Sequence, residues 1–309
     1  MKKAFLIFIS ILLGSIFIFS AYTKLFPIEL FEYTFVDTGL FNWVLVPYVS
    51  RLAIGLEFFL GILLLLNVYF EKKQTILFAL FLLLFFTVYL IVLIVKDGNS
   101  GNCGCFGDTL KFTPLESIFK NLGMLILTLI LYFKHPGIKF KFQKWLVAFF
   151  FLGSFSIPFI LLPVNLEAFT NSQEQTLNYQ LDLSALYAPG KKNQPKENLR
   201  EGKRIIAFLS LTCPHCKLGA YKLHLIHKLN PAIPIYFILN GESENLNAFF
   251  EESKAADMPY SFMTADEGFV RAAGVKLPAI LWVNNGIVEK KVKYKYLKQE
   301  EIEAWLSAK

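Results

Sequence analysis

Five long apolar segments restrict the fold of this chain more than any other feature of its sequence. They occupy approximately residues 4–22, 48–68, 75–95, 115–133 and 145–162. A helix of about 20 residues crosses the hydrocarbon core of a bilayer, so each segment is long enough to be a transmembrane helix. The composition agrees, because 55% of the 309 residues are hydrophobic and 33 are Phe. We therefore expect an all-α membrane domain with about five helices in contact with the lipid bilayer.

The first apolar segment follows Lys2 and Lys3, as the apolar part of a signal peptide would. A signal peptide ends at a cleavage site of small residues, and the sequence after residue 22 contains no such site. Four further apolar segments follow instead. We expect the first segment to remain in the mature protein as a membrane helix.

The lysines between the apolar segments predict the orientation. They cluster at the N-terminus, at Lys72 and Lys73, and between residues 134 and 144. Lysine-rich loops stay in the cytoplasm, so residues 24–47, residues 96–113 and the chain after Pro163 should lie outside. We expect a bacterial inner (cytoplasmic) membrane protein with a periplasmic C-terminal half. The net charge of +7 arises mainly in these loops and does not indicate a nucleic-acid partner.

The four cysteines form two tight pairs, and both pairs fall on the outer side in this topology. Outside the cytoplasm paired cysteines favour disulfide chemistry. The second pair follows an apolar strand and begins a helix, where the helix N-terminus and His215 favour the thiolate of Cys213 and leave Cys216 to resolve a mixed disulfide. The two strings are Cys103-Gly104-Cys105 and Cys213-Pro214-His215-Cys216.

The C-terminal half divides into a tether and a globular domain. Residues 165–202 are rich in Asn, Gln, Lys and Pro, which is typical of a linker, although residues 181–187 are amphipathic enough to pack. From residue 203 the pattern alternates between strands and helices, and Asn285-Gly286 predicts a hairpin turn. We expect a membrane domain at 1–164, a tether at 165–202 and an α/β domain at 203–309.

Residues 203–309 resemble the thioredoxin fold. The resemblance rests on the strand before Cys213, the Cys-Pro-His-Cys string, the segment ending in Leu277-Pro278-Ala279 and the hairpin after it. It implies that Pro278 is cis, lies against the active-site disulfide and belongs to the substrate loop. The Pro-His dipeptide is similar to that of the oxidising DsbA-type enzymes. Thr212 stands where thioredoxin has Trp, and the strand at 205–209 lacks thioredoxin's buried acid.

Most of residues 1–135 resemble the DoxX/MauE group of redox-associated membrane proteins. The resemblance rests on residues 14–26, on residues 51–61 with their internal Glu57, and on the string from Cys103 to Gly107. It implies a role in disulfide formation in exported proteins. Bridging residues two apart strains the small ring, so a Cys103–Cys105 disulfide would exchange easily. The alternative is a pair of free or palmitoylated thiols.

Two further alternatives concern metals and quinones. Cys213 and Cys216 could be half of a zinc site or a structural disulfide, but His224 and His227 lie 8 and 11 residues beyond Cys216 on one expected helix, so we expect no metal site. Glu57 lies well inside a span, with Lys24 as its expected partner, either in a structural ion pair or at a proton or quinone site. No cysteine lies within a span, so the sequence shows no route to a quinone.

The sequence therefore predicts a membrane-bound thiol-disulfide oxidoreductase of undetermined electron direction. Cys213 would attack, Cys216 would resolve, His215 would stabilise the thiolate, Pro278 would sit in the substrate loop, and Cys103 with Cys105 would be the exchange partner at the membrane. The protein partners would be exported proteins with thiols or disulfides, and no cofactor is required. The alternative is a tethered maturation factor or chaperone that captures thiols or Cu(I) without turnover, although four Met without a His-Met cluster disfavour copper.

Overall fold

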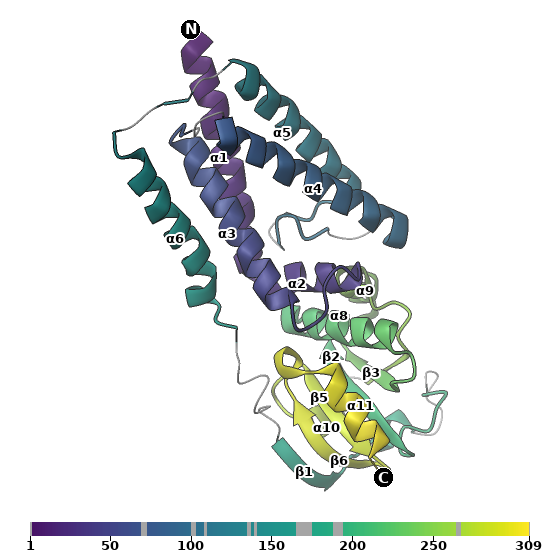
Figure 1. Cartoon of the computed structure of the whole chain (residues 1–309). Helices are drawn as coiled ribbons and strands as arrows, with labels where there is room; N and C mark the ends of the chain where they lie inside the picture. Colours follow the sequence, from purple (N-terminus) through teal and green to yellow (C-terminus); the bar gives the residue numbers. More distant parts are fainter. Residues whose placement is uncertain are drawn as a thin grey trace. The chain divides into compact units, whose positions relative to one another are not determined.

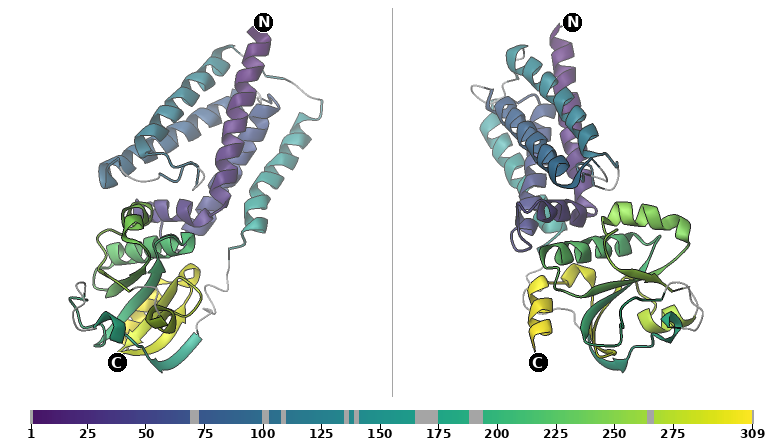
Figure 2. Two further views of the ribbon diagram at one scale, coloured as in Figure 1. Left: turned by 180° about the vertical axis from the view of Figure 1, so that it is seen from behind. Right: turned by 90° about the vertical axis from the view of Figure 1, so that its right-hand side faces the viewer.

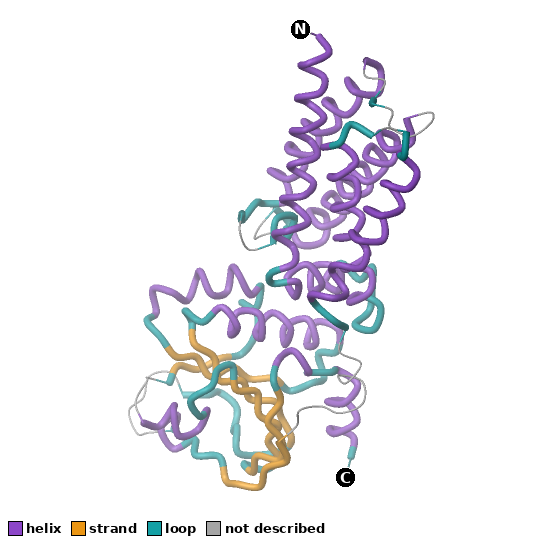
Figure 3. The backbone as a smooth tube through the Cα atoms, turned by 90° about the vertical axis from the view of Figure 1, so that its left-hand side faces the viewer, coloured by secondary structure: helices purple, strands orange, loops and turns teal. Residues whose placement is uncertain are grey.

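The chain folds into two compact units, Met1–Val164 and Asn165–Lys309, and each is described by itself. The computed structural model describes residues 2–68, 73–99, 103–107, 110–134, 137–138, 141–164, 175–187, 194–263 and 267–308. The membrane unit consists of helices, whereas the second unit contains a sheet flanked by helices (Figure 3).

Five helices of the first unit are long and apolar enough to cross a membrane, as the sequence predicts. A shorter helix, α2 (Ile28–Asp37), lies between the first two of them in the chain. The five are α1 (Lys2–Leu25), α3 (Val46–Leu65), α4 (Gln74–Asp97), α5 (Pro114–Lys134) and α6 (Gln143–Leu161) (Figure 1). The chain is therefore a multi-pass membrane protein.

Two glycines allow α1 and α3 to pack closely. A Cβ atom placed on Gly14 would lie 2.7 Å from the Gly61 carbonyl oxygen, and one on Gly61 would lie 2.6 Å from a side-chain carbon of Ile18. Small residues serve this purpose in membrane helices because they let the backbones approach. Helix α6 packs on α3, and α4 packs on α5 (Figure 2). The bundle buries Leu13, Ile54 and Leu64, while Phe81 and Phe133 face outward, as lipid contact requires.

The second unit is built on a six-stranded mixed sheet with the order β1-β6-β5-β2-β3-β4. Strands β2, β3 and β4 are parallel, and β5 and β6 form an antiparallel hairpin next to β2. The strands are β1 (Gln175–Gln180), β2 (Lys203–Ser210), β3 (Ile235–Asn240), β4 (Tyr260–Phe262), β5 (Ala279–Asn284) and β6 (Ile287–Val292).

Alternating side chains of the central strands bury both faces of this sheet, as expected for strands covered on each side. Ile206 and Phe208 belong to a core cluster with Phe269 of α10 (Glu267–Ala273). On the other face Trp282 stacks near Trp305 of α11 (Gln299–Ser307), with ring centroids 5.2 Å apart. The remaining helices are α8 (Pro214–Leu229) and α9 (Leu246–Ser253). Helix α8 connects parallel strands β2 and β3, and the β5–β6 hairpin completes the predicted thioredoxin-like fold.

The predicted tether at 165–202 needs correction. Strand β1 pairs antiparallel with β6, and the unit's core contains Leu181, Leu183, Leu186 and Leu199. The polar composition hid Leu199 and a strand at the edge of the sheet, because their burial depends on partners far along the chain. Residues 181–187 do pack, in line with their amphipathic pattern, and bury the other three leucines. The globular domain therefore begins before residue 203. Residues 165–174 and 188–193 lie outside the described residues.

Candidate active site

The Cys-Pro-His-Cys string joins β2 to α8. Cys213 caps the helix in an extended conformation, with φ −82° and ψ 119°, and Pro214 occupies its first turn. The Cys213 carbonyl oxygen accepts the amide N–H groups of Cys216 at 3.0 Å and Lys217 at 3.2 Å. Proline suits this position because the first amides of a helix have no intrahelical partner. Cys213 therefore lies at the N-terminus of α8, where the helix carries a partial positive charge.

The two thiols of this site differ in accessibility. Cys213 is partly exposed, whereas Cys216 is fully buried. Burial raises the pKa of the Cys216 thiol, because a thiolate loses its hydration there. Cys213 is therefore the thiol that an incoming disulfide can reach, and Cys216 stays protonated behind it.

Pro278 lies against the helix that carries the cysteines. The Leu277–Pro278 bond is cis. A Cβ atom on Gly219 would lie 3.2 Å from the Pro278 ring and 3.4 Å from Tyr294 Cβ. Gly219 follows Cys216 by three residues, so it lies on the same face of α8. The close approach of the proline to α8 therefore depends on the missing side chain at position 219, which the sequence analysis did not identify.

His215 is exposed on the first turn of α8, and its Nδ1 lies 3.3 Å from the Tyr294 hydroxyl. Its role in stabilising the Cys213 thiolate stays a prediction. The other two histidines of α8 have different partners. His224 Nδ1 lies 2.8 Å from an Asp257 carboxylate oxygen, and His227 Nδ1 lies 3.1 Å from the Ile233 carbonyl oxygen. Neither is arranged with Cys213 and Cys216 as a zinc ligand.

The Cys-Gly-Cys loop is held against the membrane helices through its backbone. The Cys103 amide donates to the Phe112 carbonyl at 3.0 Å, and Ser20 of α1 donates its hydroxyl to the Cys105 carbonyl at 3.2 Å. Gly104 has φ +72°, a conformation that favours glycine. The loop therefore has a defined place in the bundle and two fixed sulfur positions.

The two residues after the cysteine pair, Phe106 and Gly107, also hold the loop against α1 and α5. The Phe106 ring lies 5.6 Å from the ring of Phe19 and 4.4 Å from the Lys120 ammonium. Gly107 has φ +57°, and a Cβ atom there would lie 2.1 Å from the Thr23 carbonyl oxygen. Only glycine fits this position, because backbone atoms block any side chain. Gly104, Phe106 and Gly107 are therefore needed to position the loop that carries the two cysteines.

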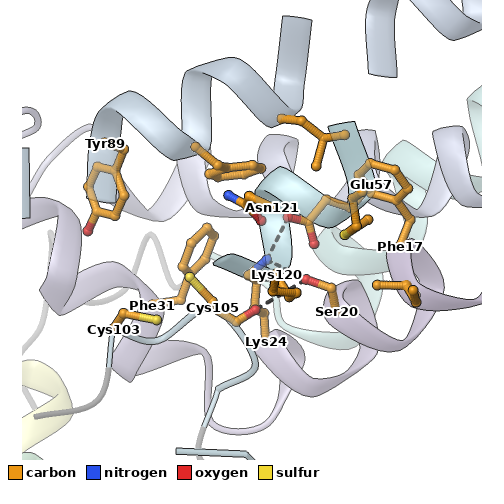
Figure 4. A pocket seen from close by; sticks show the side chains of 14 residues that line it. Phe17, Ser20, Lys24, Phe31, Glu57, Tyr89, Cys103, Cys105, Lys120 and Asn121 are labelled. Atoms are coloured by element: carbon orange, nitrogen blue, oxygen red, sulfur yellow. Dashed lines mark hydrogen bonds and ion pairs between the residues drawn. The ribbon is translucent and has the colours of Figure 1, made fainter. Parts of the chain in front are cut away.

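A small cavity of about 30 Å³, lined by both apolar and polar side chains, borders the cysteine pair (Figure 4). Lys24 donates to Glu57 at 2.5 Å and to the Ser20 hydroxyl at 2.8 Å, so the predicted partner of Glu57 is the one observed. The polar side chains that line the cavity are those of Ser20, Lys24, Glu57, Tyr89, Lys120 and Asn121, together with Cys103 and Cys105. Residues 14–26 of α1 and residues 51–61 of α3, on which the DoxX/MauE resemblance rests, therefore both contribute to this cavity.

The two loop thiols have opposite pKa shifts. The Cys103 thiol donates to Cys105, and with Lys120 and Lys24 nearby it lowers the pKa of Cys105 to about 6. The same hydrogen bond, together with burial, raises the pKa of Cys103. Cys103 Sγ also lies 3.0 Å from the Ser117 hydroxyl. Ser117 and Lys120 both come from α5, and the sequence analysis missed them because nothing local to the loop points to them.

Fold and sites together define a class: multi-pass membrane proteins with the site arrangement of a thioredoxin-like thiol-disulfide oxidoreductase. Comparisons with known proteins agree. Residues 2–134 match the family model of the methylamine utilisation protein MauE. Protein TlpB of Flavobacterium psychrophilum is 26% identical over an alignment that covers 90% of this chain and 88% of TlpB. The membrane region is thus similar to MauE over residues 2–134, and a domain with a thioredoxin-like fold follows it.

Two solved structures are similar to the second domain. One is the thioredoxin domain of a thiol-disulfide oxidoreductase from Bacteroides vulgatus, which is 17% identical, with 35% of this chain and 81% of that chain covered and a TM-score of 0.31. The other is a secreted disulfide oxidoreductase of Mycobacterium tuberculosis homologous to E. coli DsbE, also 17% identical, with 35% and 82% covered and a TM-score of 0.28.

Proposed function

We propose that this protein is a membrane-bound oxidoreductase that passes electrons between its Cys103–Cys105 and Cys213–Cys216 pairs and thereby oxidises or reduces thiols of exported proteins. One observation carries the proposal. Each pair combines a partly exposed thiol, Cys105 or Cys213, with a buried one, Cys103 or Cys216. An accessible attacking thiol and a protected resolving thiol are what two-step disulfide exchange requires.

The chemistry at the thioredoxin-like site follows from this arrangement. In the reducing direction, the Cys213 thiolate attacks a client disulfide and forms a mixed disulfide, while the departing client sulfur takes a proton. Cys216 then loses its proton and attacks Cys213, so the second client thiol leaves. The site is oxidised by two electrons and the client is reduced by two. In the oxidising direction the same steps run backwards.

The location of this exchange is part of the proposal. The lysine distribution supports an inner-membrane protein with both cysteine pairs outside the cytoplasm. The covalent link to the membrane unit raises the local concentration of one pair near the other, which favours exchange within the chain. We propose exported proteins with cysteine thiols or disulfides as clients.

Exchange between sulfur pairs requires no cofactor, because each step moves the two electrons between cysteines. A small cavity lies beside Cys105. Its volume of about 30 Å³ holds about two water molecules, whereas a cavity of about 150 Å³ accommodates benzene. This small volume favours exchange between cysteines alone, and we route no step through a quinone.

Trapping clients in cells tests the proposal. A Cys216→Ser variant should accumulate mixed disulfides through Cys213, because the resolving thiol is missing. The matched control is the double variant Cys213→Ser with Cys216→Ser, which should trap nothing. If the Cys216→Ser variant traps no client under oxidising conditions, the proposed oxidoreductase function is wrong. That result would favour a tethered thiol chaperone or Cu(I)-binding maturation factor.

The relay has its own test. Replacing Cys103 and Cys105 with Ser should shift the steady-state redox state of Cys213 and Cys216 in cells. The Cys216→Ser variant should also form an internal disulfide between Cys213 and the loop. An unchanged redox state together with no internal crosslink would mean that the Cys-Gly-Cys loop serves another partner.

A further inference from the structure

The two cysteines of the membrane loop are not equivalent. Cys103 is 2% exposed, and its Sγ lies 3.0 Å from the Ser117 hydroxyl. Cys105 is partly exposed, and both cysteines border the cavity. In the view of Figure 4, Cys105 lies between Cys103 and the two lysines of the cavity. Cys105 is thus the more exposed residue of the pair and the one nearer to the two lysines.

The charges around the cavity do not balance when both thiols are protonated. Lys24 is neutralised by Glu57 at 2.5 Å, and both side chains are buried. Lys120 has no carboxylate within ion-pair distance among the described residues, and its ammonium lies on the Phe106 ring beside Cys105. The cavity therefore carries one positive charge in excess.

An unpaired charge within a membrane bundle is costly and needs a counter-charge. A thiolate on Cys105 provides one at the cavity itself. The titratable groups that face the cavity come from each long helix around it and from the loop. They are Lys24 of α1, Glu57 of α3, Tyr89 of α4, Lys120 of α5, and Cys103 and Cys105. Apart from Lys120, the charged groups in this set cancel, so the ammonium and the Cys105 sulfur form the remaining pair.

We propose that Cys105 is the exchange-active thiol of the membrane domain, that Lys120 is the cation that stabilises its thiolate, and that Cys103 is the resolving thiol. This inference rests on the proposed function and names the atoms of its membrane half. Ser117 orients the Cys103 thiol, and Lys24 and Glu57 form an ion pair of zero net charge in the lining of the cavity.

The exchange then balances as follows. The Cys105 thiolate attacks the Cys213 sulfur of an oxidised Cys213–Cys216 pair, and Cys216 leaves as a thiolate that takes up a proton. Cys103 loses its proton and attacks the Cys105 sulfur, which releases the Cys213 thiolate. Two electrons have passed from the loop to the thioredoxin-like site. The reverse sequence oxidises the thioredoxin-like site.

The test uses the full-length protein in detergent, with Cys213 and Cys216 replaced by Ser so that only the loop thiols react. Iodoacetamide is the probe, and mass spectrometry identifies the modified residue. Cys105 should be modified at least about tenfold faster than Cys103 at pH 7. Lys120→Met should slow this reaction about tenfold, which corresponds to one pKa unit, and Lys120→Arg should restore it. The matched control is Lys96→Met, which removes a lysine in the last turn of α4 that does not line the cavity, and it should leave the rate unchanged.

Three results would overturn the inference: faster modification of Cys103, an unchanged rate–pH profile in Lys120→Met, or a slow Lys120→Arg variant that melts at the temperature of the parent protein. A fourth measurement separates it from the proposed function. In the Cys216→Ser variant, the internal crosslink should join Cys213 to Cys105. A crosslink to Cys103 would refute the assignment and leave the relay intact, whereas the absence of any crosslink would refute both.

Discussion

The two cysteine sites reach the same division between an accessible and a protected thiol by different physical means. At Cys213 the division is produced by local structure, because a helix begins at the cysteine and buries Cys216 one turn later. At Cys105 it is assembled from distant segments, with Ser20 of α1 and Ser117 and Lys120 of α5 around a loop. The arrangement at Cys213 depends on residues that are close to it in the sequence. An assembled device depends on the packing of the whole bundle.

The largest expected effect is all-or-none and concerns the side of the membrane on which the two sites lie. A membrane-impermeant maleimide added to intact spheroplasts after reduction should label Cys105 and Cys213, because both residues are partly exposed and the lysine distribution predicts that both lie outside. Mass spectrometry of the labelled peptides measures this. Labelling of either residue only after lysis would break the comparison, since the two pairs could not then meet.

The membrane-loop site should be more sensitive to one added methyl group than the thioredoxin-like site. Gly107→Ala places a carbon 2.1 Å from the Thr23 carbonyl oxygen, so the loop must leave its seat. We expect the Cys105 modification rate to fall at least about tenfold, with Cys213 unaffected. Gly123→Ala is the matched control, because nothing lies within 4 Å of the added carbon. Equal effects of the two substitutions would show that the seat is not rigid.

The corresponding substitution at the local site should have a smaller effect. Gly219→Ala adds a carbon 3.2 Å from the Pro278 ring, which must yield by a few tenths of an ångström. Overpacking of this kind costs about 1–3 kcal/mol, partly offset by the better helix propensity of Ala. Denaturant unfolding of the thioredoxin-like unit within the full chain measures the loss. A gain in stability would indicate that Pro278 does not press on α8.

The smallest expected effect is the pH dependence of the thioredoxin-like domain. The Trp305 indole N–H donates to Glu289 at 2.7 Å, and this hydrogen bond and one from Asn284 lower the pKa of Glu289. A depressed carboxyl pKa stabilises the fold above the unfolded pKa of about 4.5, and the contribution disappears as the pH falls through the folded value.

We expect less than about 0.5 kcal/mol from Glu289, because the carboxylate is largely solvated. Thermal melting between pH 3 and 7 should therefore differ only slightly between the parent protein and Glu289→Gln. A difference of several degrees would mean that this domain also depends on an assembled charge network, and the contrast between the two sites would weaken.

The sequence predicted what is encoded locally. Five apolar segments, a Cys-x-x-Cys string after a strand and an Asn-Gly turn each specify structure within about 20 residues, and all were found. The Lys24–Glu57 pair was also predicted, because Glu57 is an acid deep in a span and needs a partner. Lys120, Ser117 and the close contact of Gly107 with Thr23 were not, since they depend on how α1 and α5 meet the loop. Strand β1 and Leu199 of the supposed tether were missed for the same reason, since β1 pairs with β6 and Leu199 packs in the core of the second unit.

Gly107 has a consequence for recognising relatives of this protein. Because backbone atoms of α1 fill the space where a side chain would begin, position 107 reports whether the loop can dock at all. Cysteines two apart occur in many unrelated loops, and their presence alone is a weak criterion. A membrane protein that keeps both cysteines but carries a larger residue two places after the second should be classed apart, whatever its overall similarity. The glycine is thus a better fingerprint of this architecture than the thiols beside it.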